Sequence, residues 1–218
     1  MMKKVVLLLL LLLVFQAHAK SGSMKLLAVS NGDTDPKGSI ADLELEIKEG
    51  RGRIFIDSFP LSRLDTQIST RFAKEVACNF LEADCSRLDF FYTIRANSAL
   101  IGGPSASAAT TILTISVLGD IPLDKDTTIT GTINTGGIIG PVGGIESKVD
   151  AASKTGLKKV LVPKFSQLNL SNISEYKEKY KIEIVEVSQL EDALQEMTGR
   201  EFRTAAEISV SSYYIETM

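Results

Sequence analysis

The chain has 218 residues, 44% of them hydrophobic and 23% charged, and its formal net charge is −3. That length and hydrophobic content are enough for one domain with a proper core. The acidic balance argues against a general nucleic-acid-binding protein, because such proteins present a basic surface. With one histidine and two cysteines the sequence offers no set of metal ligands, so we expect neither a metal site nor a cofactor.

Residues 1–19 have the pattern of a secretory signal peptide. Lys3 and Lys4 form a basic start, residues 5–15 are apolar, and Ala17-His18-Ala19 resembles a cleavage site. The apolar run is too short to cross a bilayer comfortably, since a spanning helix needs about 20 residues. We therefore expect a secreted or cell-surface protein, which is attached to the membrane only if the segment is retained. A start at Met24 is an alternative that would abolish export.

Cys78 and Cys85 are the two cysteines, and an even number in an exported protein suggests a disulfide. On a continuous helix their Cα atoms would lie about 10.5 Å apart, which is too far for a bond. If the helix ends near Ala83, the chain can turn back and close the bond. Two free thiols are the alternative.

The first half of the chain alternates in the manner of strands and then changes to a helical period. Residues 25–30, 39–48 and 53–57 are predicted strands, and the last two are expected to form a hairpin or meander. A helix of about 20 residues is predicted to begin near Ser62. The helix is indicated by apolar residues that recur every four positions, namely Leu64, Ile68, Phe72, Val76 and Phe80.

The second half favours alternating strands and helices after a strand over residues 88–96. The predicted helices are residues 104–118, 145–154 and 189–197, and the predicted strands are residues 127–134, 160–162 and 182–187. A glycine-rich stretch over residues 136–144 leaves room for a short apolar strand. Hairpins first and alternating units later indicate an α+β or α/β fold.

The candidate nucleophile is Ser105, on the first turn of the helix that Pro104 opens. Unpaired N–H groups and the helix dipole at such a position suit a developing oxyanion. Gly102 and Gly103 would let the backbone approach a substrate carbonyl. Because the only histidine is His18, in the signal-like segment, a Ser-His-Asp mechanism is excluded for the mature chain and a lysine is the natural base.

Lys148 is the candidate base, because its helix supplies apolar neighbours and a glycine-rich loop precedes it. A lysine with a pKa of about 10.4 is almost fully protonated at pH 7. Burial disfavours the charged form, and lowering the pKa to about 8 requires roughly 3.3 kcal/mol. A helix-capping serine and a solvated helix lysine are the plain structural alternatives for these two residues. Ser107 is a rival nucleophile, but its side chain is expected to face elsewhere.

Three motifs resemble the proteolytic domain of Lon proteases: PSAS at 104–107, TGTI at 130–133, and GPVGGIESKVDAA at 140–152 followed by TGLKKVLVPK. The resemblance implies that Ser105 is the nucleophile, that Lys148 is its base, and that Thr130 hydrogen-bonds the lysine amine. Gly102, Gly103 and Ala106 are expected to support the site. The resemblance covers about residues 26–197 and implies an α+β fold, with an N-terminal hairpin or meander followed by a mixed sheet packed with helices.

The chain departs from the family at two points. Many members carry an acidic residue where Gly102 stands, and most carry glycine where Ser107 stands. No G-x-x-x-x-G-K-[ST] motif occurs, so the ATPase module of Lon is not expected here. Lon domains form six-membered rings that depend partly on that module, so a homohexamer is a weaker implication.

The expected organisation is a signal segment over residues 1–19, a Lon-like domain over residues 24–198 and a tail over residues 199–218. The leading hypothesis is an ATP-independent serine endopeptidase that cleaves unfolded polypeptides outside the cytoplasm. A non-catalytic peptide- or protein-binding module on the same fold is the alternative. A Ser-Lys amidase or esterase for small substrates is a third option.

Overall fold

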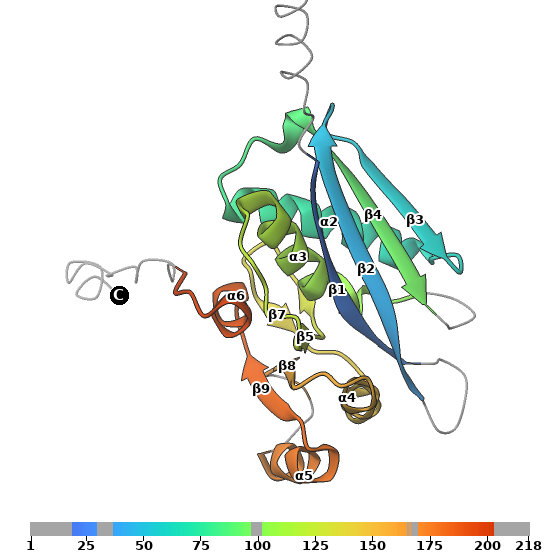
Figure 1. Ribbon diagram of the computed structural model, residues 1–218, viewed down its shortest axis with the longest axis vertical. Helices are drawn as coiled ribbons and strands as arrows, with labels where there is room; N and C mark the ends of the chain where they lie inside the picture. The colour runs from blue at the N-terminus through green and yellow to red at the C-terminus, as the bar shows by residue number, and fades with distance from the viewer. Residues whose placement is uncertain (1–18, 30–36, 97–101, 165, 167–169, 203–218) are drawn as a thin grey trace, which may run out of the picture.

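The computed structural model describes residues 19–29, 37–96, 102–164, 166 and 170–202 (Figure 1). The predicted signal segment up to residue 18 and the tail beyond residue 202 lie outside the described residues. Two larger sheets and one two-stranded sheet share the described chain, with helices packed between and around them. The mixture of a mostly antiparallel sheet and a parallel sheet with helices confirms the predicted α+β class.

The first sheet has the strand order β1-β2-β4-β3. β1 (Lys20–Val29) and β2 (Gly38–Glu49) form an antiparallel hairpin, and β2 also pairs antiparallel with β4 (Leu88–Ala96). β3 (Ile54–Phe59) pairs parallel with β4 and not with β2. The prediction that the segments now called β2 and β3 form a hairpin is therefore wrong. A long crossover connection follows β3 and brings the chain back so that β4 runs parallel to β3. β4 thus lies between β2 and β3.

One face of this sheet packs against helices and the other faces solvent. The buried side chains alternate with exposed acidic ones along β2, where Leu43 and Leu45 are fully buried and Glu44 is exposed. The inner face lies against α2 (Leu64–Phe80) and α3 (Ser107–Gly119). Figure 1 shows both helices on the same side of the sheet. The period-two pattern read from the sequence is thus that of a half-buried antiparallel sheet.

The apolar stripe that predicted α2 does not lie on one face of the helix. A helix turns about 100° per residue, so a four-residue spacing drifts by about 40° at each step. Val76 consequently lies in the core, whereas Leu64 and Ile68 are 70% and 58% exposed. The first buried positions along α2 are occupied by small or polar residues, namely Thr66, Thr70 and Ala73. The helix is where we expected it, but its first two apolar residues face outward.

The second sheet is parallel, with the strand order β5-β8-β9, and both of its faces are covered. Its strands are β5 (Thr127–Ile129), β8 (Lys159–Pro163) and β9 (Glu183–Val187). α4 (Ile145–Lys154) and α5 (Leu170–Tyr180) cover one face, and α3 and α6 (Leu190–Thr198) cover the other. Burial on both faces explains the continuous apolar run of β8.

Two segments differ from the sequence predictions. The strand predicted over residues 127–134 is interrupted at Thr130 and Gly131, and its second part, β6 (Thr132–Ile133), pairs with β7 (Ile139–Gly140). α5 was not predicted, although Ile173, Tyr176 and Tyr180 are spaced like one face of a helix. No helix among the described residues is long and apolar enough to cross a membrane.

Cys78 and Cys85 form a disulfide, with their Cα atoms 6.2 Å apart. α2 ends at Phe80, and the chain turns back so that the Ala83 N–H donates to the Cys78 carbonyl. Cys85 then opens η1 (Cys85–Arg87), the short 3₁₀ turn before β4. The end of the helix thus permits a bond that a continuous helix would forbid, as the conditional prediction required.

Candidate active site

Ser105 lies on η2 (Pro104–Ala106), a 3₁₀ turn that leads directly into α3. The turn begins from Gly103, whose φ of 95° and ψ of 151° lie in a region that is essentially restricted to glycine. A Cβ atom built on Gly103 would meet no atom within 4 Å, so the space in front of the turn is open. Ser105 itself is half-buried. The glycine and the proline therefore present the serine at a helix start, as the sequence predicted.

Two backbone hydrogen bonds fix the Ser105 turn to the interrupted strand. The Gly131 N–H donates to the Ser105 carbonyl at 2.9 Å, and the Ala108 N–H donates to the Gly131 carbonyl at 3.1 Å. Gly131 must be glycine, because a Cβ atom there would come within 2.6 Å of the Ile139 side chain. Gly131, which follows Thr130 at the end of β5, therefore bonds to the serine turn instead of continuing the parallel sheet.

Lys148 is in the first half of α4 and its side chain is almost completely buried, with 1% exposed. The helix starts at Gly144, which takes a left-handed φ of 66° and whose carbonyl accepts the Lys148 N–H. Its buried face also carries Ile145, Val149 and Ala152, which pack against β8 and β9. The lysine is on the buried side of its helix and Lys154 is on the exposed side.

The Lys148 Nζ donates to the Thr130 Oγ1 at 2.9 Å. Among the described residues this is the side chain's one hydrogen bond, and no described carboxylate forms an ion pair with it. Burial disfavours the ammonium form and lowers the pKa of Lys148 to about 8. About a tenth of the amine is therefore unprotonated at pH 7, compared with far less than a hundredth for a solvated lysine.

Thr130 connects the lysine to the serine turn. Its hydroxyl accepts from Lys148 and donates to the Ser105 carbonyl at 3.4 Å, while its N–H donates to the Leu161 carbonyl on β8. Within the described part of the chain no hydrogen bond joins the Ser105 hydroxyl directly to the amine. Such catalytic contacts are often long without substrate. The structure therefore brings Ser105, Thr130 and Lys148 to one site.

Ser107 is built into the core and is not available as a nucleophile. Its side chain is buried, donates to the Pro104 carbonyl at 2.8 Å and accepts the Ile133 N–H at 3.1 Å. These bonds fix the start of α3 against β6. The expectation that this side chain faces away from the site is confirmed. Ala106 accepts the Thr110 hydroxyl and packs against the core, so it supports the turn from beneath.

Two residues near the serine were not identified from the sequence. Asp65, on the first turn of α2, has its carboxylate close to the Gly103 N–H, which favours the charged form of the carboxyl group. The side chain of Arg63 lies against Gly102, where an added Cβ atom would come within 2.4 Å of the Arg63 Cδ. An acidic residue on the first turn of a helix is ordinarily interpreted as a partner of the helix dipole, and nothing in the sequence connects it to a loop 38 positions away.

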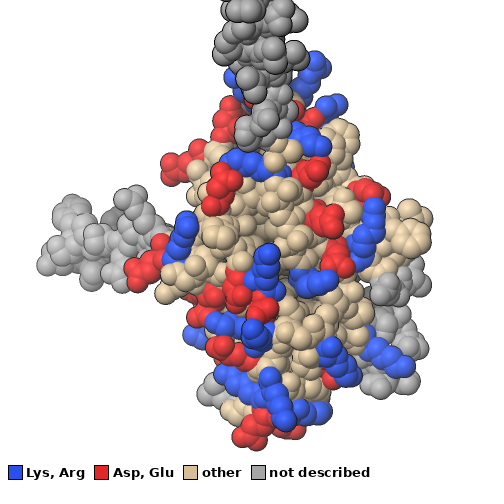
Figure 2. Space-filling model, viewed as in Figure 1, with Lys and Arg blue, Asp and Glu red and all other residues tan. Residues whose placement is uncertain are grey.

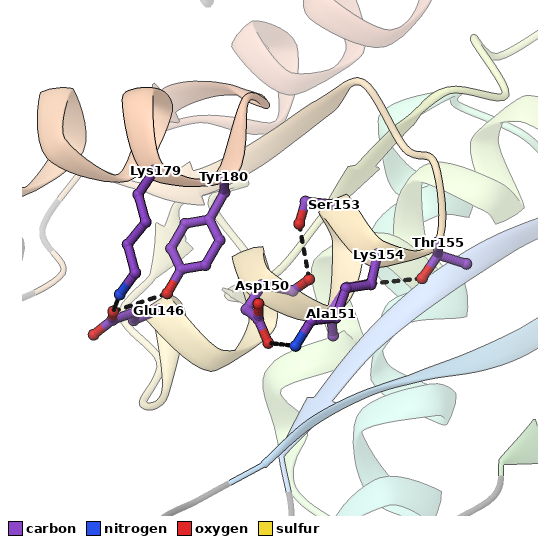
Figure 3. A network of polar contacts seen from close by, with 8 residues as sticks. All are labelled: Glu146, Asp150, Ala151, Ser153, Lys154, Thr155, Lys179 and Tyr180. Atoms are coloured by element: carbon purple, nitrogen blue, oxygen red, sulfur yellow. Dashed lines mark hydrogen bonds and ion pairs between the residues drawn. The ribbon is translucent and has the colours of Figure 1, made fainter.

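The orientation of α4 is supported by α5 through Glu146, which lies two positions before Lys148 (Figure 3). The Glu146 carboxylate accepts from Lys179 at 2.8 Å and from the Tyr180 hydroxyl at 2.9 Å. Hydrogen bonds from Lys179 and Tyr180 lower the pKa of Glu146. Figure 3 also shows Asp150 bound to Lys154 on the exposed face of the same helix. These side chains anchor the helix that carries the buried amine.

Comparison with known proteins gives a match in the part of the chain that carries this site. Residues 94–199 match the family model of the Lon protease (S16) C-terminal proteolytic domain. The archaeal Lon protease of Pyrococcus abyssi is 33% identical over 112 residues, the Lon protease of Trichlorobacter lovleyi 37% over 93 residues, and the Lon protease of Azospirillum brasilense 39% over 99 residues.

The matches cover only part of this chain and a much smaller part of each relative. These three matches cover 51%, 43% and 45% of this chain but only 11–12% of each relative. The four-stranded sheet lies mostly outside the family match, which begins at residue 94 in β4. The match contains Ser105, Thr130 and Lys148, together with the helices and strands that position them.

Proposed function

Residues 94–199 match the Lon proteolytic domain, and on that premise we propose that this chain is a serine endopeptidase whose nucleophile is Ser105 and whose base is Lys148. We further propose that it needs no ATP and acts on unfolded polypeptides outside the cytoplasm. One observation supports the proposal above all others. A lysine amine is kept buried, with its pKa lowered to about 8, beside the turn that presents a serine.

In the proposed mechanism the unprotonated Lys148 amine takes the proton of the Ser105 hydroxyl as its oxygen attacks the peptide carbonyl. The N–H groups at the start of η2 and the helix dipole stabilise the oxyanion. The tetrahedral intermediate collapses to an acyl-serine ester, and the lysine proton passes to the leaving amine. Water then attacks the ester, Lys148 accepts its proton and returns it to Ser105, and the new carboxyl end leaves.

Thr130 has a positioning role in this scheme. Its hydroxyl holds the amine at one side and the serine turn at the other, so the two groups approach in a fixed orientation. The hydroxyl offers the amine a neutral partner. A carboxylate in the same place would stabilise the ammonium form and raise the pKa of the lysine, which would remove the base at neutral pH.

The proposed substrate class rests on a motif that the 218 residues lack. The 218 residues contain no P-loop motif, so nothing in them couples ATP hydrolysis to unfolding. Polypeptides that are already unfolded are therefore the accessible substrates. The Cys78–Cys85 disulfide and the signal-like start both favour an oxidising compartment. A six-membered assembly, which the resemblance implies, stays a prediction that the molar mass in solution would test.

The proposal is tested by digestion of unfolded casein without nucleotide, followed by mass spectrometry of the products. Wild type is expected to produce internal cleavages, and Ser105→Ala and Lys148→Ala are expected to produce none. Circular dichroism and thermal unfolding show whether the variants keep the fold. Cleavage by a folded Ser105→Ala variant would overturn the proposal. If wild type binds casein without cutting it, the protein is a binding module, and if it hydrolyses only small esters or amides, it is an amidase or esterase.

A further inference from the structure

An apolar surface is exposed where β3 turns into α2. Phe59, Leu61, Leu64 and Ile68 form this surface, which we call the β3–α2 surface, and their side chains are 72%, 78%, 70% and 58% exposed. Figure 2 shows the same region at the right edge of the molecule as a bulge without charged side chains, over the end of β3 and the start of α2. Large apolar side chains that gather on a surface mark interaction sites.

The helical part of this surface is continuous along α2. Leu64 and Ile68 are one turn apart and therefore lie side by side on the helix. Leu61 precedes Leu64 by three positions, in the segment that enters the helix. These residues do not belong to either core cluster of the described residues. The drift of the four-residue spacing leaves them outside the core, so packing of the fold does not explain why they are apolar.

The β3–α2 surface adjoins the turn that carries Ser105. The carboxylate of Asp65, next to Leu64, lies close to the N–H of Gly103, and the methylene stem of Arg63 lies against Gly102. The stem of a long charged side chain is apolar and extends an apolar surface. The start of α2 thus lies against the serine turn, with the Arg63 stem packed on Gly102 and the Asp65 carboxylate close to the Gly103 N–H. Beyond Gly103 the space is open.

We propose that Leu61, Leu64 and Ile68 bind apolar side chains of an extended polypeptide substrate beside the bond that Ser105 attacks. This inference rests on the proposed function and names the part of the substrate that is recognised. An unfolded chain differs from a folded one chiefly in its exposed apolar residues, so an apolar surface next to the nucleophile selects unfolded substrates without an ATPase. Continuity of this surface with the serine turn favours substrate over a second copy of the chain as its occupant.

The test uses a pair of internally quenched peptides. One is a casein peptide that wild type cleaves, and the other is the same peptide with each Leu, Ile, Val and Phe more than one position from the cut replaced by Ser. The enzyme variant is Leu61→Gln/Leu64→Gln/Ile68→Gln, because glutamine is a good helix former and removes the apolar contact. Phe55→Gln is the matched control. Phe55 is exposed on the same strand as Phe59 but stacks on Phe91, at the other end of β3 from the start of α2.

For wild type and for Phe55→Gln, we expect the apolar peptide to have the higher kcat/KM. In the triple variant the ratio of the two kcat/KM values is expected to fall at least tenfold, mainly through a higher KM for the apolar peptide. An equal loss on both peptides, or no loss, contradicts the inference. So does a change in molar mass by light scattering in the triple variant, because the surface would then be an interface between copies.

Binding separates this inference from the proposed function. Anisotropy of a labelled, unstructured casein segment rich in Leu, Ile, Val and Phe, chosen independently of cleavage, is measured on Ser105→Ala and on Ser105→Ala combined with the triple substitution. If neither wild type nor any variant cleaves, the endopeptidase proposal fails, yet loss of peptide binding in the combined variant still supports the β3–α2 surface. If wild type cleaves and the combined variant binds as tightly as Ser105→Ala, the surface inference fails alone.

Discussion

Lys148 and Lys154 lie on the same helix but in opposite environments, and their contrast gives the sharpest prediction at the scale of the residue. Lys148 is buried and its pKa is lowered to about 8, whereas Lys154 is exposed and paired with Asp150. We expect kcat/KM to rise as the pH increases through about 8, since the unprotonated amine is the proposed base. Lys148→Met should abolish the rise and Lys154→Met should preserve it. A profile that stays flat from pH 6 to 10 would falsify the assignment.

The same burial has a cost in stability. An unfolded chain binds a proton on this lysine up to about pH 10.5, whereas the folded protein releases it near pH 8, so stability should increase with pH between these values. The shift corresponds to about 3 kcal/mol at pH 7. Lys148→Met should therefore be more stable than wild type at pH 7 by up to about that amount in urea unfolding, and the advantage should shrink as the pH rises from about 8 to 10.5. An advantage that stays constant over this range would contradict the shift.

Thr130 is expected to affect the pH profile as well as the rate. Thr130→Val removes the oxygen that accepts from Lys148 and Nζ loses its partner, which further disfavours the ammonium form. The midpoint of the pH profile should move below 8 while kcat falls at least tenfold. Thr128→Val is the matched control, because Thr128 is equally buried but its hydroxyl donates to the Lys25 carbonyl. This control should lose about 1 kcal/mol of stability and keep the midpoint.

At the scale of the element, the contact between α4 and α5 is predicted to maintain the position of Lys148. Glu146→Gln weakens the bonds from Lys179 and Tyr180 that lower the pKa of the carboxyl group. That stabilisation is present above the ordinary glutamate pKa and is lost as the pH falls through the lowered value. The variant should lose at most about 1 kcal/mol at pH 7, because the pair is partly exposed. Unfolding at pH 7 and in acid tests this, and an equal deficit in acid would contradict it.

The disulfide is predicted to stabilise the end of α2 without contributing to the chemistry. Cys78→Ala/Cys85→Ala should lower the free energy of unfolding by about 2 kcal/mol, because the short loop that the bond closes gains freedom in the unfolded chain. The kcat of the folded variant should stay within about twofold of wild type, a margin well below the effect of losing a catalytic group. Wild type in reductant should match the variant in urea unfolding, and a reductant effect on the variant itself would show that the assay reports something else.

At the scale of the whole molecule, the prediction concerns which proteins are cut. Without a P-loop in its 218 residues, the chain should cleave unfolded casein equally fast with and without ATP and Mg²⁺. A stably folded protein of similar length should resist until it is unfolded by reduction or heat. Gel analysis of paired folded and unfolded substrates measures the difference. Equal cleavage of both forms would mean that recognition does not depend on exposed apolar chain.

Much of the site was predictable because its chemistry is carried by short local patterns. Gly103-Pro104-Ser105 encodes a helix start, and the residues around Lys148 encode one apolar helix face, so the serine turn and the buried lysine were both expected. The strands over residues 88–96 and 182–187 follow for the same reason, since alternation and β-branched residues act within a few positions. Asp65 and Arg63 were not predictable, because their contacts with Gly102 and Gly103 join segments that α2 and β4 separate in the sequence.

The sequence by itself determined the class of fold and pointed to a candidate nucleophile and base, because each depends on residue identity and local spacing. Only the tertiary structure decided that β4 lies between β2 and β3, that Thr130 holds Lys148 against the Ser105 turn, and that Leu64 and Ile68 face solvent. Such features depend on which distant segments pack together. A four-residue apolar spacing fits a helix but does not say which of its turns the rest of the chain will cover.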